Sequence, residues 1–169
     1  AIKVSQNISN LDLRNNILNN HLYNSASSGS GSKHYSIFSN GTSNSFSHID
    51  YNLYSVAENQ GRLGFINNAD QATLQNLQNS FGQNQNSKNF KPTFISKLDL
   101  HLTDAQNYDI DNIGFTIPAI TIDIDDELRN NTTPDIGADE FTTIPCNMVN
   151  GGVIIPAIDS ICFGEADAI

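Results

Sequence analysis

The sequence predicts an all-β fold built from short strand-and-turn units stacked on one another. Two observations lead to this prediction. Short apolar runs alternate with polar residues at period two between clusters of Asn, Ser and Gly, which is typical of strands with one buried face. Residues 13–18 and 49–54 also resemble each other, and a repeated strand-turn unit is the sequence signature of a solenoid.

The expected strands follow the apolar runs along the chain. They cover residues 2–4, 11–13, 17–18, 35–38, 49–54, 63–66, 93–95 and 98–102. Within the repeat, Asn16 and Asn52 occupy equivalent positions, each followed by two large apolar residues. The Ser/Gly-rich stretch 25–32 between the two copies is interpreted as a loop that leaves the stack rather than as a domain linker.

One short helix is expected near residues 70–81. Asp70 is a suitable N-cap, the apolar residues Leu74, Leu77 and Phe81 fall on one helical face, and Gly82 provides a C-terminal stop. Because the opposite face is Gln and Asn, we expect the helix to lie on a β surface.

Asparagine is unusually frequent. The chain has 24 Asn, of which 18 precede residue 98. A nucleotide bias of the genome would produce this excess, and so would an architecture that needs Asn at repeated turns, where it tolerates the left-handed conformation.

Composition and charge exclude several classes of protein. The 169 residues (18.4 kDa) carry a net charge of −10, which argues against nucleic acid as a partner because phosphate binding depends on Lys and Arg. No apolar run is long enough to span a membrane. The first residues lack a signal-peptide pattern, so Ala1 is interpreted as a processed terminus or as the interior of a longer chain.

Several motifs occur in a fixed order that resembles the last coils of right-handed parallel β-helix proteins, as found among secreted and surface proteins of the Bacteroidetes. The motifs lie at residues 14–18, 49–54, 73–74, 83–87, 91–95, 98–102, 122–129 and 134–141. The final segment, PDIGADEF, is similar to the closing signature of that family. This resemblance implies a terminal β-helix segment over residues 1–141, with one short helix.

Two residues depart from the family pattern without threatening this fold. Asp126 stands where the family has glycine in a turn, and aspartate tolerates positive φ at modest strain. Lys91 replaces the aspartate that precedes proline in another motif, which removes a capping carboxylate.

The last residues resemble a different module. Residues 146–165 are similar to the opening of the Ig-like β-sandwich repeats of giant Bacteroidetes surface proteins, so we divide the chain into residues 1–141 and a linker with an incomplete Ig-like module at 142–169. This part is expected to be a short extended tail. Cys146 and Cys162 can pair in an exported protein, pair with residues beyond Ile169, or stay free.

The closing segment contains the candidate structural residues. Arg129 is the only cation of residues 99–169, and we interpret it as a clamp that pairs with Asp135 and Glu140 and closes the last coil. Gly137 supplies permissive φ in the following turn, and Ala138 is expected to fit close to the backbone.

Asp123, Asp125 and Asp126 are weak candidates for calcium binding, because carboxylate oxygens are the ligands that calcium prefers. The spacing lacks the pattern of an EF-hand loop. The alternative is a solvated turn that Arg129 partly neutralises, and no other cofactor is expected.

Catalytic residues are not expected. β-Helix polysaccharide lyases need a basic residue beside groups that neutralise a carboxylate, whereas His21, His34, His48 and His101 look isolated and the lysines do not recur at coil spacing. Four tyrosines and one phenylalanine would form a sugar-stacking strip or, alternatively, pack inside the coil and under loops: Tyr23, Tyr35, Tyr51, Tyr54 and Phe38.

The resemblance implies a non-catalytic structural or binding segment of a large exported cell-surface adhesin, secreted by the type IX route and associated with gliding. The alternative is the non-catalytic end of a β-helix polysaccharide lyase or other carbohydrate-active enzyme. The implied partners are neighbouring coils, downstream Ig-like repeats and surface polysaccharide, in an extracellular location.

Overall fold

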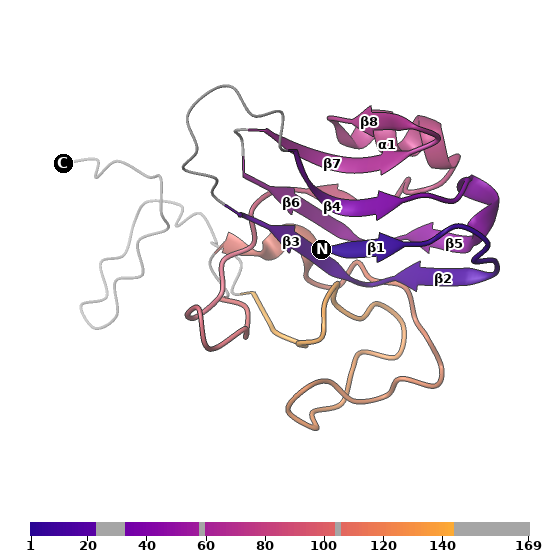
Figure 1. The fold of residues 1–169 in the computed structure, drawn as a ribbon. Coiled ribbons are helices and arrows are strands. Elements are labelled where there is room, and N and C mark those ends of the chain that lie inside the picture. Colours follow the sequence, from indigo (N-terminus) through magenta and orange to yellow (C-terminus); the bar gives the residue numbers. More distant parts are fainter. Residues whose placement is uncertain (23–32, 58–59, 104–105, 144–169) are drawn as a thin grey trace, which may run out of the picture.

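A computed structural model describes residues 1–22, 33–57, 60–103 and 106–143. Strands dominate the part before residue 90, together with one short α-helix, and the part from 90 to 143 has little regular structure (Figure 1). The predicted all-β class is therefore confirmed. None of the helices in the described part is long and apolar enough to cross a bilayer.

The strands are short. They are β1 (Ile2–Val4), β2 (Leu11–Arg14), β3 (Ile17–Asn20), β4 (His34–Ser39), β5 (Phe46–Asp50), β6 (Leu53–Val56), β7 (Gly61–Ile66), β8 (Ala69–Gln71) and β9 (Lys88–Asn89). Helix α1 spans Leu74–Phe81, and within the described ranges 3₁₀ turns occur at Ser43–Ser45 and Tyr108–Ile110.

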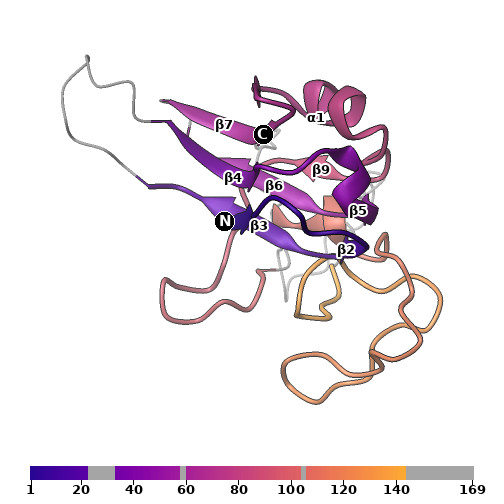
Figure 2. The ribbon, with the colours of Figure 1, turned by 45° about the vertical axis from the view of Figure 1, so that its right-hand side comes forward.

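The strands form three sheets with the orders β1-β4-β7-β8, β2-β5 and β3-β6-β9. Every pairing between these strands is parallel except the hairpin of β7 with β8. The chain visits the three sheets in the same order twice, so each circuit places one further strand on each sheet. Figure 2 shows the successive strands layered in this way.

The register confirms the alignment of the repeat. Leu13 pairs with Ile49, and Leu18 pairs with Tyr54, as the comparison of residues 13–18 with 49–54 predicts. Equivalent residues of the first two circuits are thus 36 positions apart in these sheets. Side chains at equivalent positions are stacked directly above one another.

A polar column runs through the turn between the second and third sheets. The Oδ1 atom of Asn52 accepts hydrogen bonds from the backbone N–H (3.0 Å) and the Nδ2 group (3.1 Å) of Asn16. Its own Nδ2 donates to the Leu13 carbonyl at 2.8 Å, and its backbone N–H donates to Ser87 Oγ at 3.0 Å. Buried backbone groups need such partners, so this column joins three successive circuits.

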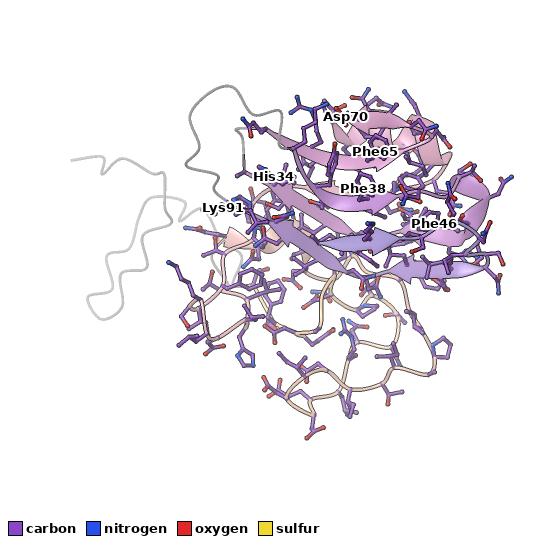
Figure 3. The ribbon with its side chains drawn as sticks, viewed as in Figure 1. His34, Phe38, Phe46, Phe65, Asp70 and Lys91 are labelled. Atoms are coloured by element: carbon purple, nitrogen blue, oxygen red, sulfur yellow. The ribbon has the colours of Figure 1, made fainter. Side chains whose placement is uncertain are left out.

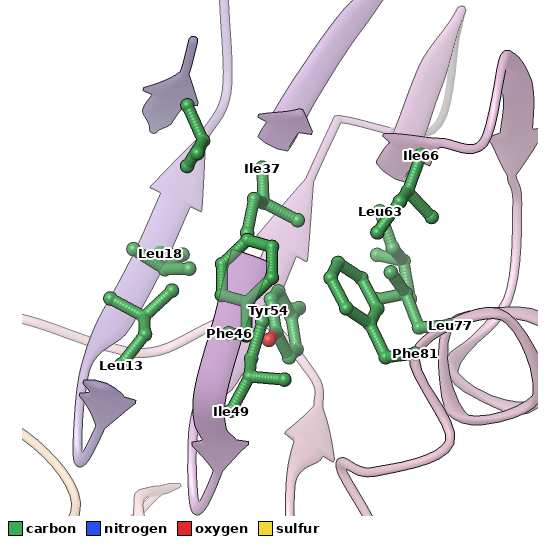
Figure 4. Packing of buried hydrophobic residues seen from close by; sticks show 11 residues of the cluster. Leu13, Leu18, Ile37, Phe46, Ile49, Tyr54, Leu63, Ile66, Leu77 and Phe81 are labelled. Atoms are coloured by element: carbon green, nitrogen blue, oxygen red, sulfur yellow. The ribbon is translucent and has the colours of Figure 1, made fainter. Parts of the chain in front are cut away.

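The interior of the stack is apolar (Figure 4). Its fully enclosed side chains include Ile37, Ile49 and Tyr54 of the second circuit and Ile66 of β7. The ring of Phe81 from α1 meets Phe46 edge-on at 5.1 Å. Helix α1 therefore packs onto the same core and covers it beside β7.

The helix begins later than predicted. Thr73, not Asp70, is the N-cap: its side chain accepts the backbone N–H of Asn76, and Asn76 bonds back to Thr73. Asp70 instead lies in β8 and forms an ion pair with Lys33. The predicted stop is confirmed, since Gly82 adopts the left-handed conformation with φ of 69°.

Asparagine occupies most of the non-glycine positions with positive φ among the described residues. Of the ten non-glycine residues with positive φ in the described part, seven are Asn: Asn7, Asn10, Asn15, Asn67, Asn68, Asn84 and Asn112. This use favours the architectural explanation of the Asn excess. Asp126 also has positive φ, at 64°, as expected from its place in a turn.

The predicted strands at 93–95 and 98–102 are wrong, since the structure has a single antiparallel bridge there, between Phe94 and Leu102. This part is held by a second apolar cluster, which combines Leu102, Ile110 and Ile136 with Leu53 of β6 and Ile17 of β3. Residues 90–141 therefore cover the outer side of the β3-β6-β9 sheet.

Candidate functional site

Arg129 organises the closing segment, largely through backbone carbonyls. Its guanidinium donates to the carbonyl of Asp135 at 2.7 Å and to that of Gly137 at 3.0 Å. Its Nε atom lies 3.3 Å from Glu140 Oε2, and the Arg129 side chain is only 8% exposed. The expected clamp thus pairs with the carboxylate of Glu140, while Asp135 contributes its backbone oxygen instead of its carboxylate.

The Asp135 carboxylate is occupied elsewhere. Its two oxygens accept the backbone N–H groups of Asn112 (2.6 Å) and Phe141 (2.7 Å), and the residue is fully buried. Burial raises the pKa of Asp135 to about 7; the two N–H donors act against this rise, and the nearby negative charges of Glu140 and Asp111 add to it. Asp135 therefore ties two distant segments together.

The turn at Gly137 uses its glycine as predicted. Gly137 has φ of 128°, and a Cβ placed there would come within 3.0 Å of Ile17 Cδ1. Its backbone N–H donates to the Asn15 carbonyl at 3.2 Å. Ala138, in contrast, is exposed and contributes its carbonyl, which accepts the Ile124 N–H at 3.0 Å.

The closing segment lies against the side of the stack rather than across its end. Ile136 packs in the cluster that contains Leu53 and Ile17, and Gly137 bonds to the turn between β2 and β3. The sequence predicted that this segment seals the last coil. The covering of the stack beside β7 comes instead from β8 and α1, as Figure 1 shows.

Among the three candidate calcium ligands, Asp123 is the one that bonds to backbone groups of the surrounding loop. Asp123 Oδ1 accepts the backbone N–H groups of Asp125 (2.8 Å) and Glu127 (2.9 Å), and Oδ2 accepts that of Glu140 (3.1 Å). Burial would raise the pKa of Asp123, but these donors outweigh it and lower the pKa below its ordinary value. Asp123 is thus committed to holding its loop, and Asp125 points elsewhere.

Asp125 meets a histidine. Its Oδ2 atom lies 2.8 Å from His101 Nε2, and His101 Nδ1 forms a short contact with Asp99. The hydrogen bond with Asp99, and then the contact with Asp125, raise the pKa of His101 to about 9. The expectation that His101 is isolated is wrong, because three segments distant in sequence meet around it.

Asp139 completes this group. One oxygen atom each from Asp125 and Asp139 and one ring nitrogen of His101 lie within 4.8 Å of one another. Asp139 is 7% exposed, and its Oδ2 accepts the Leu102 N–H at 2.7 Å. Sequence reasoning missed His101 and Asp139 here, since nothing in their spacing brings them to Asp125.

A groove of about 590 Å³ adjoins this group. Its walls come from the β2–β3 turn and from residues 94–139, with apolar side chains such as Phe94, Leu100 and Ile120. Asp123 and Asp139 also line the groove. Large apolar side chains are exposed in the same part of the chain, Leu98 at 99% and Leu100 at 63%.

An aromatic ladder lies on the outside of the β1-β4-β7-β8 sheet. The rings of Phe38 and Phe65 stack with centroids 4.6 Å apart and planes 5° from parallel (Figure 3). Lys3 lies 5.9 Å from the Phe38 centroid, and Tyr35 meets both rings at their edges. Because the ring faces contact one another, the arrangement favours structural packing over a sugar-stacking platform.

The other histidines have separate surroundings. His21 Nε2 bonds to Ser55 Oγ at 2.7 Å, and His48 lies 3.7 Å from Asp12. Burial lowers the pKa of His21, and the positive charge of Lys91 lowers it further. Cys146 and Cys162, for which a disulfide was one of the possibilities, lie outside the described residues.

Comparisons of the chain with protein-family models, with curated proteins and with solved structures found no match. The case for a function therefore depends on the motifs of the sequence and on the geometry given above.

Proposed function

We propose that residues 1–141 are the C-terminal coils of a right-handed parallel β-helix, and that they form a non-catalytic structural segment of a large exported surface adhesin. The single observation that carries this proposal is the parallel register: Leu13 pairs with Ile49, Ile17 with Leu53, and Leu53 with Lys88. The offset is 35 or 36 residues for these pairs and 27 residues between β4 and β7, as in Ile37 with Gly64. Parallel pairing repeated in one sheet after another, with turns of unequal length between the strands, is typical of a coiled solenoid.

The asymmetry of the sheets supports a terminal position. Among the described residues, β1, β2 and β3 each pair on one side only, which leaves backbone groups free for another coil of the same kind. On the opposite side, β8 turns antiparallel to β7 and α1 packs on the core. In the β1-β4-β7-β8 sheet, the antiparallel strand β8 takes the place of a further parallel strand.

The chemistry of the described residues favours a structural role over catalysis. Asp135 and Asp123 bond to backbone N–H groups, Arg129 bonds to backbone carbonyls and Glu140, and the aromatic ladder packs on itself. Charged groups used in this way fix loops in place. A rigid, covered solenoid would hold adhesive modules, such as downstream Ig-like repeats, at a distance from the cell. Surface polysaccharide is the proposed binding partner.

Two measurements test this proposal. Antibodies raised against the chain are expected to label intact cells that make the parent protein, and a signal seen only after lysis would contradict surface exposure. The chain incubated with alginate, pectate or chondroitin is expected to release no unsaturated uronates. Ultraviolet absorbance from such products would contradict a non-catalytic segment and would place the chain in a polysaccharide lyase with its catalytic residues in these coils.

A further inference from the structure

We propose that His101, Asp125 and Asp139 bind a divalent transition-metal ion of the Zn²⁺ type. The three side chains come from segments that are distant in sequence, yet one ligand atom from each lies within 4.8 Å of the other two. Ligands of a tetrahedral zinc ion lie about 3.3 Å apart. To surround an ion, His101 Nε2 and Asp125 Oδ2, which lie 2.8 Å apart, would separate slightly, and the more distant ligand atoms would approach by up to about 1.5 Å.

The histidine has the orientation expected of a metal ligand. Its Nδ1 atom is held by the carboxylate of Asp99, and ligating histidines usually bond a carboxylate or carbonyl through their second nitrogen. This contact directs Nε2 toward Asp125 and Asp139. Nε2 is shielded from solvent, and the Asp125 carboxylate oxygen Oδ2 lies 2.8 Å away. The two atoms therefore already face each other, as two ligands of one ion would.

The carboxylates of Asp139 and Asp125 differ in burial and in how firmly they are held. Asp139 is nine-tenths buried and fixed, because its Oδ2 accepts the N–H of Leu102, the residue next to His101. Within the described residues, no hydrogen bond uses its Oδ1. Asp125 is half exposed, at 49%, in a turn where it can adjust to an ion. The adjoining groove, which Asp139 lines, provides an approach from solvent.

The donor set selects the class of ion. One imidazole nitrogen and two carboxylate oxygens suit zinc and its neighbours, whereas calcium takes six to eight oxygen ligands. Asp123, a member of the calcium set predicted from the sequence, already bonds to three backbone N–H groups. The geometry therefore favours a nitrogen-containing site over a calcium loop.

Titration calorimetry with Zn²⁺ on the full chain tests the proposal. Cys146 and Cys162 are replaced by serine in every sample, because thiolates bind zinc themselves. One ion per chain is expected. His101→Gln and Asp125→Asn should each weaken binding at least about tenfold, whereas Asp126→Asn, an equal charge change at an adjacent exposed residue, should leave it within about twofold. If the His101 and Asp125 variants each bound Zn²⁺ as tightly as the chain with both residues intact, the proposal would be overturned.

A second measurement does not depend on how the variants fold. In the chain with intact His101, Zn²⁺ is expected to shift the ¹⁵N resonances of that imidazole to metal-bound values. A ring that stays doubly protonated would show that His101 is only an ion-paired imidazolium between Asp99 and Asp125. Binding of Ca²⁺ that survives His101→Gln and is lost in Asp123→Asn would likewise overturn the proposal in favour of the calcium set.

Discussion

Asn52 lies directly above Asn16 in the turn column, where its Oδ1 atom accepts both the backbone N–H and the side-chain N–H of Asn16. Asn52 is fully buried, and its carboxamide satisfies two backbone groups, the N–H of Asn16 and the carbonyl of Leu13. The relationship explains why an asparagine occurs at the same place in both copies of the repeat.

Replacing Asn52 by alanine is expected to lower the free energy of unfolding by about 2–3 kcal/mol. The change leaves the Asn16 N–H and the Leu13 carbonyl without their partner in a buried turn. Urea denaturation measures the effect. Asn44→Ala is the matched control, because Asn44 is exposed; its effect should stay within about 0.5 kcal/mol. Similar losses in the two variants would contradict the role of the column.

Asp135 is expected to make stability depend on pH. Its pKa rises from 3.8 in the unfolded chain to about 7 in the folded protein, so between these values only the folded state holds the proton. The contribution of Asp135 is therefore complete below the lower value and is lost as pH rises toward 7, by at most about 1.4 kcal/mol per pH unit.

This prediction is checked as a difference between proteins. Asp135→Asn, which is neutral at every pH, should lose stability because its amide group faces one backbone N–H with another donor. The gap in unfolding free energy between wild type and this variant should shrink from pH 5 to pH 7.5. Asp126→Asn should show no such trend, and a gap that widens with pH would refute the assignment.

Gly137→Ala is expected to destabilise the protein by about 2 kcal/mol or more. The added Cβ would meet Ile17 Cδ1 at 3.0 Å, and φ of 128° is costly for any residue with a side chain. Gly82→Ala is the control, since that glycine has φ of 69° and open space around it; its cost should be near 1 kcal/mol. Thermal unfolding compares the two, and an equal or reversed order would count against the close packing of the turn on β3.

Arg129→Lys is expected to cost about 1–3 kcal/mol although it keeps the charge. A lysine ammonium cannot reach the carbonyls of Asp135 and Gly137 and the Glu140 carboxylate with the fork of a guanidinium. The same change at Arg62, whose side chain is one-third exposed, should be nearly neutral. Chemical denaturation of both variants tests this, and a neutral Arg129→Lys would show that charge alone is required.

The sequence analysis succeeded where structure is set locally and repeated. Period-two patterns located most of the strands before residue 67, and the aligned pair Leu13 and Ile49 gave the register between two circuits. The helix start was misplaced because Asp70 and Thr73 are both good N-caps. Asn76, three residues after Thr73, was the available signal, because the residue at this position reaches back in a capping box.

Residues 90–141 could not be predicted in the same way. Their conformation is fixed by side-chain-to-backbone bonds with distant residues, such as the two that join Asn15 to the backbone of Phe115, 100 positions along the chain. A bond of this kind leaves no periodic pattern of apolar and polar residues in the sequence. The meeting of His101 with Asp125 and Asp139 has the same origin, so composition suggested an acidic cluster without revealing its histidine.

The antiparallel strand β8 and the helix that follows it make the two edges of this sheet different. A sheet that can pair with a further parallel strand at only one edge can be lengthened only by duplicating units at that edge. In the solenoid proposed above, further units would therefore be added on the side of β1 rather than on the side of β8.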